Sequence, residues 1–286
     1  MRVASCEVFQ AHTELDRLSV QNRLLAAYEE PIYRRVLAGR RDVRLLDVGS
    51  NDGSKTVARF SHGNVSRVIG LEYHHELVER ARTDYGDGRF CFRQCDVEAP
   101  GFAVRLAELM AEQGVEAFDV IHISLVLLHL HDPGALLALL RGVLAPGGQL
   151  IVVEADDSAS KAVPDDGHLF RDFLRILSFD PLSGDRHCGG KTLRLLAKSG
   201  YRDIALENTA VRAGGAEAGT KADIFDIFCS YLPQDIRLLR EREPENAAYA
   251  ACGAWLDRHY GDLRRMILRD GTEISMGVSI MTCYGE

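Results

Sequence analysis

The stretch Leu45-Leu46-Asp47-Val48-Gly49-Ser50-Asn51-Asp52-Gly53 decides the fold. Residues 43–48 form a short, nearly unbroken apolar run, as expected of a strand that is buried on both faces. A turn of small residues follows, and a helix is predicted over 54–61. Glycine at positions 49 and 53 lets the backbone approach a ligand closely, and the start of a helix offers free N–H groups. The segment therefore predicts a ligand-binding turn between a buried strand and a helix.

The charges of this turn separate two classes of ligand. The spacing is not the G-x-G-x-x-G of a dinucleotide fold, and Asp47 precedes the first glycine. An anionic pyrophosphate would meet Asp47 and Asp52 unfavourably, whereas a ligand with an ammonium and a sulfonium would meet them favourably. The pattern favours S-adenosylmethionine over a nicotinamide cofactor.

Strands alternate with helices on the C-terminal side of this turn. Besides 43–48, short apolar runs predict strands at 67–71, 90–95, 118–123 and 149–154. Helical periodicity between them predicts helices at 54–61, 74–84, 103–113 and 133–144. Such alternation with short loops predicts a parallel sheet with helices on both faces.

The two ends of the chain are more helical. Apolar residues recur at helical spacing through the first forty residues. After residue 154 we expect helices at 165–177 and 191–199, a strand at 201–211, a helical block over 222–268 and a last strand over 273–284. The predicted organisation is a helical N-terminal lid (1–40), an α/β core (41–212), a helical cap insertion (213–271) and the final strand of the core (272–286).

Two further strands end in acidic residues. Glu72 closes the strand that ends about twenty residues beyond the glycine turn, where a carboxylate can accept hydrogen bonds from both ribose hydroxyls. Asp96 follows the next strand, where it could accept the adenine amino group while Val97 packs on the ring. Acids at strand ends are common, but these three strand ends share one edge of the sheet, where ligands of such sheets bind.

At this point the chain resembles class I S-adenosylmethionine-dependent methyltransferases of the generic small-molecule type. The stretch 47–53 resembles their D-x-G-x-G-x-G motif, with Asn51 in place of the middle glycine. Phe118-Asp119-Val120-Ile121, with the segment from Ser124 to Pro133, is similar to their fourth-strand segment. Leu144-Ala145-Pro146-Gly147-Gly148 resembles their L-x-P-G-G turn. The resemblance covers residues 43–154 well and the remainder loosely.

The resemblance implies a fold, a cofactor and a set of contacts. The fold is a doubly wound, mostly parallel, seven-stranded sheet of the Rossmann-like methyltransferase type, and the cofactor is S-adenosylmethionine. Gly49, Gly53 and Asp47 are expected at its methionine part, Glu72 at the ribose, and Asp96 and Val97 at the adenine. Ile123 and Ser124 are expected beside the sulfonium, and Asn51 and Tyr73 complete the predicted cofactor-binding set.

The acceptor side gives weaker signals. His129 and His131 follow the fourth strand, near where the methyl group should point, so either could be a general base; histidines also recur there across unrelated substrates. Five residues are candidates for a substrate wall: Tyr28, His168, Arg171, Arg186 and His187. The alternatives are a surface loop around 180–189 and a packing helix near Tyr28.

Composition excludes several classes of protein. The formal charge of −8 argues against a general nucleic-acid binder, which needs a concentrated basic surface, and the arginines at 34–44 are read as a solvated helix end and loop. The longest apolar-rich stretch, 118–130, is far too short to span a membrane. Seven cysteines without a C-x-x-C pair fit neither a disulfide scaffold nor a zinc site. We therefore expect no bound metal. Because the sequence shows no charged-then-apolar leader, we expect a cytoplasmic protein.

The sequence therefore predicts an S-adenosylmethionine-dependent methyltransferase acting on an oxygen or nitrogen of a small metabolite, possible as a homodimer, with no nucleic-acid or membrane partner. Two alternatives stay open. The acceptor could be a protein or RNA, or the chain could bind the cofactor or a partner without catalysing a reaction.

Overall fold

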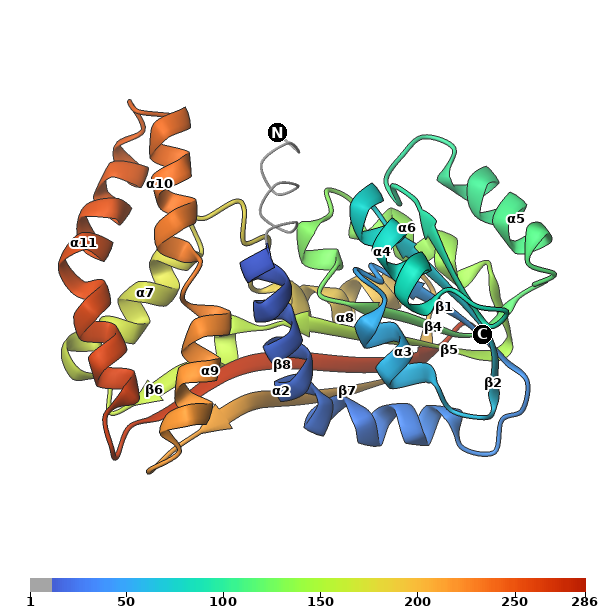
Figure 1. Cartoon of the computed structure of the whole chain (residues 1–286), viewed down its shortest axis with the longest axis horizontal. Helices are drawn as coiled ribbons and strands as arrows, with labels where there is room; N and C mark the ends of the chain where they lie inside the picture. The colour runs from blue at the N-terminus through green and yellow to red at the C-terminus, as the bar shows by residue number, and fades with distance from the viewer. Residues whose placement is uncertain (1–11) are drawn as a thin grey trace. The chain divides into compact units, whose positions relative to one another are not determined.

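The computed structural model describes residues 12–286, which pack into two compact units (Figure 1). The sheet unit contains Ala26–Ala155, Cys188–Asn208 and Ser279–Glu286. The helical unit contains Asp156–His187, Thr209–Val278 and the described residues up to Leu25. The first eleven residues of the predicted lid lie outside the described residues.

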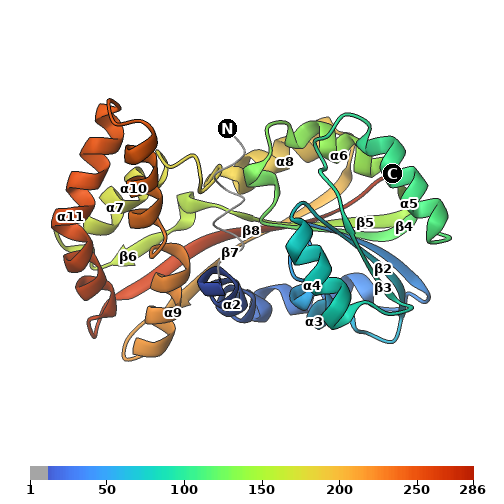
Figure 2. The ribbon, with the colours of Figure 1, turned by 45° about the horizontal axis from the view of Figure 1, so that its top comes forward.

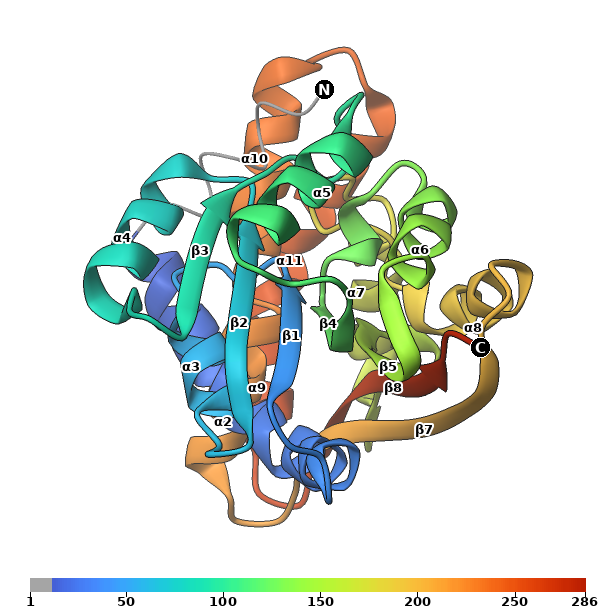
Figure 3. The same ribbon diagram turned by 90° about the vertical axis from the view of Figure 1, so that its right-hand side faces the viewer.

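The sheet unit is built on parallel strands in the order β3-β2-β1-β4-β5, and the end of β8 follows β5. Figure 3 shows β3, β2, β1 and β4 side by side. Their side chains are buried on both faces, as the unbroken apolar runs predict. The bounds are β1 (Val43–Val48), β2 (Val65–Glu72), β3 (Phe90–Gln94), β4 (Phe118–Ser124) and β5 (Leu144–Ala155).

Helices cover both faces of these strands (Figure 2). One face carries α3 (Ser54–Phe60) and α4 (His75–Tyr85), and the other carries α5 (Phe102–Glu112), α6 (Pro133–Arg141) and α8 (Cys188–Lys198). The helices of the second layer turn apolar side chains to the sheet, and Leu106, Leu137 and Leu196 share one core with strand residues. The sheet unit is therefore a doubly wound α/β structure, as predicted.

The strand order fixes where a ligand is expected. The chain runs outward from β1 to β2 and β3, then returns to place β4 on the other side of β1. Ligands of open α/β sheets bind outside the carboxyl ends of the strands at this switch in direction. The ends of β1 and β4 are therefore the place to look for a site.

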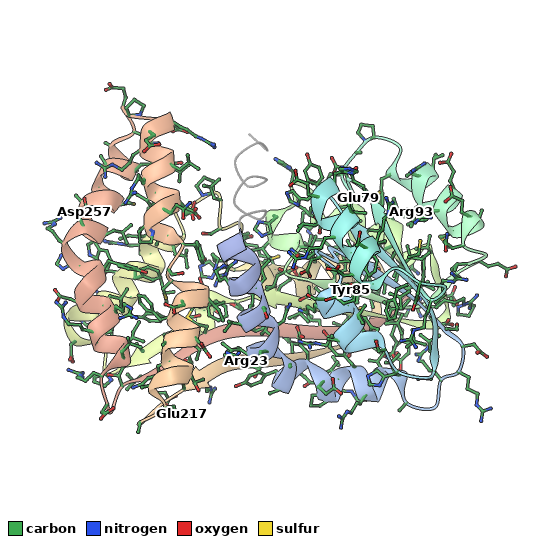
Figure 4. The ribbon with its side chains drawn as sticks, viewed as in Figure 1. Arg23, Glu79, Tyr85, Arg93, Glu217 and Asp257 are labelled. Atoms are coloured by element: carbon green, nitrogen blue, oxygen red, sulfur yellow. The ribbon has the colours of Figure 1, made fainter. Side chains whose placement is uncertain are left out.

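The helical unit is dominated by packed helices. Its elements are α7 (Leu169–Leu177), α9 (Ala218–Phe228), α10 (Leu232–Arg242) and α11 (Ala247–Leu268), with the short strand β6 (Lys161–Val163) antiparallel to the start of β8 (Glu273–Tyr284). It also holds the one-turn helices η2 (Asp157–Ala159) and η3 (Asp166–His168). Helix α11 contacts α7, α9 and α10. The first part of α2 (His12–Leu37) belongs to this unit, where Arg23, labelled in Figure 4, pairs with Asp223 of α9 at 2.7 Å.

The structure confirms the fold class and refines its details. Within residues 12–286 the sheet has eight strands rather than the predicted seven. The strand that the sequence missed is β6, which is only three residues long and therefore shows no periodicity. The strand expected at 201–211 is β7 (Arg202–Ala213), and α8 begins at Cys188 inside a stretch expected to be a loop. Residues 156–187 pack with the helical unit. The predicted domain boundaries stay a prediction. Among the described residues, no helix is long and apolar enough to cross a bilayer.

One buried ion pair joins the two ends of the segment 157–186 inside the helical unit. The guanidinium of Arg186 donates from Nε to Asp157 Oδ2 (3.0 Å) and from a terminal nitrogen to Asp157 Oδ1 (2.9 Å). Both side chains are less than one-tenth exposed. This bidentate geometry satisfies a carboxylate and a guanidinium that would otherwise be costly to bury.

The Asp157→Ala variant should therefore lose about 3–5 kcal/mol of unfolding free energy, because a buried guanidinium is left unpaired. The double variant Asp157→Leu/Arg186→Met should recover most of that loss, because it removes both charges. Urea unfolding of the three proteins measures the difference. A single variant as stable as the wild type would show that the pair does not hold this unit together.

Candidate cofactor site and active site

The turn after β1 adopts a left-handed backbone at alternate positions. The φ angles are 78° at Gly49, 50° at Asn51 and 78° at Gly53. Glycine adopts this conformation without strain, and asparagine tolerates it better than most other residues. Asn51 therefore preserves the backbone shape at the place where the resembling motif has its middle glycine.

The two glycines are also required by packing within the protein. A Cβ on Gly49 would lie 2.3 Å from Val126 Cγ2, and one on Gly53 would lie 2.8 Å from Phe92 Cζ. Sequence reasoning assigned these glycines to the close approach of a ligand. In the structure, the side chain of Val126 occupies the space next to Gly49, and the side chain of Phe92 occupies the space next to Gly53.

The backbone amides of this turn already have acceptors inside the protein. The six N–H groups from 49 to 54 all donate internally: Gly49 and Ser50 to Leu71 O (2.8 and 2.9 Å), Asn51 to Glu72 Oε2 (3.0 Å), Asp52 to Asn51 Oδ1 (2.7 Å), Gly53 to Ser50 O (3.0 Å) and Ser54 to Asp52 Oδ1 (3.1 Å). An amide cradle for a phosphate needs such groups free. Of these six amides only that of Ser54 belongs to the helix start, where free N–H groups were expected, and it donates to Asp52.

Glu72 ties the ends of two strands together. Its Oε2 accepts from the Asn51 amide at 3.0 Å, and its Oε1 accepts from the His74 amide at 2.9 Å and contacts His74 Nδ1 at 2.8 Å. Its side chain is nearly buried. Each carboxylate oxygen has two lone pairs, so acceptor capacity remains for a hydroxyl. The predicted ribose ligand is thus held rigidly at the expected strand end.

The remaining predicted cofactor residues lie at the strand ends of the same unit. Asp96 is half-buried, and its Oδ1 accepts from the Glu98 amide at 3.0 Å. Val97 is half-buried against the apolar core, whereas Tyr73 is 42% exposed. Ile123 is fully buried and Ser124, which ends β4, is half-buried. Their contacts with a cofactor stay predictions.

Asp47 points into the protein. Its Oδ1 lies 2.7 Å from His122 Nδ1, and its Oδ2 accepts from the Thr56 hydroxyl. The other ring nitrogen of His122 lies 2.9 Å from the Tyr33 hydroxyl, and all of these side chains are buried. Burial, followed by the charge of Glu29, raises the pKa of Tyr33 well above its usual range. Asp47 thus supports the turn from the interior of the protein and links β1 with β4.

A second buried group contains two cations. Glu29, from the second half of α2, is fully buried; its Oε1 lies 3.1 Å from Lys55 Nζ and its Oε2 lies 3.0 Å from the Arg59 guanidinium. Lys55 Nζ also donates to Ser124 Oγ at 2.7 Å. Burial raises the pKa of the Glu29 carboxyl. The charges of Lys55, Arg59 and His122 lower this pKa by more than burial raises it, so the pKa lies below the ordinary 4.5. This ion cluster reaches the carboxyl end of β4.

The two predicted general bases lie in the loop after β4. His129 ends the one-turn helix η1 (Leu127–His129) and is exposed. His131 is also exposed, and Glu98 binds it through the backbone amide (2.7 Å) and Nδ1 (3.2 Å). Glu154 accepts the Val126 and Leu127 amides at 3.1 and 2.8 Å, which fixes the start of η1. Both histidines therefore lie on a loop that carboxylates anchor.

The predicted substrate residues divide between the units. Tyr28 lies on α2 in the sheet unit and is half-buried. His168, Arg171 and His187 are exposed in the helical unit, and Arg186 forms the buried pair with Asp157. Their role toward an acceptor stays a prediction.

Sequence reasoning missed the buried polar residues that surround Asp47 and Glu29 inside the protein. His122 interrupts an apolar strand, and a single histidine in such a run signals a buried partner. Glu29 and Tyr33 stand four residues apart on one face of a helix that otherwise buries Leu25 and Ile32, which is a weaker signal of the same kind. Lys55 and Arg59 gave no signal, because basic residues on a short helix are ordinarily solvated.

Comparison with known proteins identifies the sheet unit. Residues 46–152 match the family described as methyltransferase domain. An uncharacterised methyltransferase of Schizosaccharomyces pombe is 31% identical over 114 residues, 40% of this chain and 40% of that protein. A trans-aconitate 2-methyltransferase of Methylobacterium radiotolerans is 28% identical over 159 residues, 56% of this chain and 54% of that protein.

A solved structure shows the same fold. The phosphoethanolamine N-methyltransferase 2 of Haemonchus contortus, in complex with phosphomonomethylethanolamine and S-adenosylhomocysteine, aligns with a TM-score of 0.55 at 14% identity, covering 99% of this chain and 60% of that chain. Residues 46–152 thus match a methyltransferase domain, as the sequence predicts, and the structure has the fold of S-adenosylmethionine-dependent methyltransferases. The chain spans about half or less of the length of these curated relatives.

The residues at the switch point fit this cofactor. It carries two cationic groups and one carboxylate, and the site presents the carboxylates of Asp52 and Glu72 beside a turn whose amides are already bonded. No group of three or more metal-ligating side chains is present among residues 12–286.

The left-handed angle at Asn51 gives a first test of the turn. Asn51→Ala should lower the unfolding free energy by about 1–2 kcal/mol, because alanine is strained at this φ and cannot accept from the Asp52 amide. Asn51→Gly should lose less, because only the acceptor is lost. Urea unfolding compares the variants, and an alanine variant as stable as the wild type would contradict this account of the turn.

The lowered pKa of Glu29 predicts a pH dependence. A depressed carboxyl pKa stabilises the fold above the unfolded value of 4.5, and that stability is lost as the pH falls through the folded pKa. Glu29→Gln should therefore be less stable than the wild type by about 3–5 kcal/mol near pH 7, because two cations lose their partner. The gap should narrow as the pH falls below about 4.5. Urea unfolding at a series of pH values measures it; a gap that does not change with pH would argue against an ionised Glu29.

Proposed function

We propose that the whole chain is an enzyme that transfers a methyl group from S-adenosylmethionine to an oxygen or nitrogen of a small metabolite. One observation supports the cofactor part most directly. The turn at the switch point presents carboxylates, while its six amides already donate within the protein. Such a turn suits a cationic ligand and disfavours a pyrophosphate.

The chemistry needs little from the protein beyond position and a dry site. When bound, S-adenosylmethionine supplies a methyl group on an already activated sulfonium. The protein's part is to hold that group in line with the acceptor and to exclude water. Glu72 is rigid because two amides fix it, and Ser124 is fixed by its bond to Lys55. We assign these residues to the ribose and to the neighbourhood of the sulfonium.

A general base is needed only if the acceptor keeps a proton that it does not release unaided. We propose His129 and His131 for that role, since both lie on the loop after β4. Glu98 holds the loop at His131 and the next amide, Asp132. A base held at a fixed place can serve an acceptor that is itself held in line.

Two proteins that are similar to this chain support the proposal of a small acceptor. The related Methylobacterium radiotolerans protein is named for trans-aconitate, and the Haemonchus contortus structure holds phosphomonomethylethanolamine. Both names denote small anionic compounds. We propose Tyr28, His168, Arg171, Arg186 and His187 as acceptor-binding candidates; a cytoplasmic location, a homodimer and the lack of a nucleic-acid or membrane partner stay predictions.

Titration calorimetry with S-adenosylhomocysteine tests the cofactor. The wild type should bind it, and Glu72→Gln should bind at least tenfold more weakly (about 1.4 kcal/mol), because the ribose loses an ionised acceptor. Glu79→Gln, an exposed change on α4 (Figure 4), should bind as the wild type does. Parallel titration with NAD is the counter-test: NAD binding without S-adenosylhomocysteine binding would overturn the proposal. Screening small acceptors, then protein and RNA, for methyl transfer decides the acceptor class.

A further inference from the structure

The strongest unassigned feature of the sheet unit is the side chain of Lys55. It follows β1, and its ammonium bonds Ser124 Oγ, which ends β4, at 2.7 Å. The β1–β4 boundary is the switch point at which a ligand is expected. A cation therefore lies across the place where the cofactor is proposed to bind.

Lys55 has capacity for a further partner. An ammonium has three donors, of which the structure engages one with Glu29 Oε1 (3.1 Å) and one with Ser124 Oγ. Its side chain is 16% exposed, whereas that of Arg59 is 7% exposed and bonded to the same carboxylate. The exposed part of this ion cluster is thus on the lysine.

The cofactor brings a group that the turn does not satisfy. Its methionine part ends in a carboxylate, and the six amides from 49 to 54 already donate elsewhere. The nearby Asp52 and Glu72 would repel that carboxylate. A cationic side chain would therefore favour a carboxylate placed beside these groups.

We propose that Lys55 binds the carboxylate of the cofactor's methionine part and thereby selects the intact amino acid over a decarboxylated form. This inference rests on the proposed function. Glu29 is the positioning residue: fully buried and held by Arg59, it fixes the ammonium at the end of β4. The Ser124 hydroxyl completes the placement.

The test compares two ligands on three proteins by titration calorimetry. The ligands are S-adenosylhomocysteine and its decarboxylated analogue, which keeps the amine and lacks only the carboxylate. The proteins are the wild type, Lys55→Gln, and Lys198→Gln as a matched change of an exposed lysine in the sheet unit. Circular dichroism confirms that each variant is folded.

In the wild type, removing the carboxylate should weaken binding at least tenfold (about 1.4 kcal/mol). Lys55→Gln should weaken S-adenosylhomocysteine by a similar factor and change the affinity for the decarboxylated analogue by less than about twofold. Lys198→Gln should change neither. If Lys55→Gln does not fold, Lys55→Met, which also removes the cation and leaves Glu29 paired with Arg59, undergoes the same comparison.

Three results would overturn the inference while leaving the proposed function in place. They are equal wild-type affinity for the two ligands, equal weakening of both ligands by Lys55→Gln, and no weakening of either ligand. Equal weakening would mean that Lys55 only supports the fold of the site. A folded wild type that binds neither ligand would instead overturn the proposed function, and the role of Lys55 with it.

Discussion

The left-handed turn after β1 is the constraint on which the sheet unit depends. Its alternating left-handed residues direct the backbone amides toward Leu71, Glu72 and the turn itself. A ligand at this turn would therefore meet side chains rather than the amides of residues 49–54. This explains why acidic residues and a lysine, rather than an amide cradle, gather at the switch point, and why a cationic cofactor suits it better than a dinucleotide.

The pairing of the buried polar residues next to the turn is a consequence of the same constraint. A chain reversal at the edge of a sheet covered on both faces leaves polar atoms inside, and each must find a partner. Asp47 meets Thr56 and His122, and Glu29 meets Lys55 and Arg59. Because such groups are costly to bury unpaired, these bonds restrict the positions of α2, α3, β1 and β4 relative to one another within the unit.

The sequence predicted the parallel strands and the helices between them, because apolar runs and helical periodicity are local signals. It also placed Glu72 at the end of its strand. It missed β6, whose three residues carry no period, and it missed His122 as a partner of Asp47, because these two residues are 75 positions apart. It assigned Gly49 to ligand approach, whereas the nearest obstacle to a side chain there is Val126. Long-range packing, which no local pattern encodes, accounts for the differences at Asp47 and Gly49.

The same reasoning narrows what the N-terminal helix can do. The lid over residues 1–40 stays a prediction, and α2 contributes its described residues up to Leu25 to the helical unit and those from Ala26 on to the sheet unit. Its second half carries Glu29, which is fully buried and ion-paired with two residues of α3. Swinging that half away would expose an apolar face and separate three charges at once, which costs several kcal/mol. Residues 26–37 are therefore part of the framework that holds Lys55.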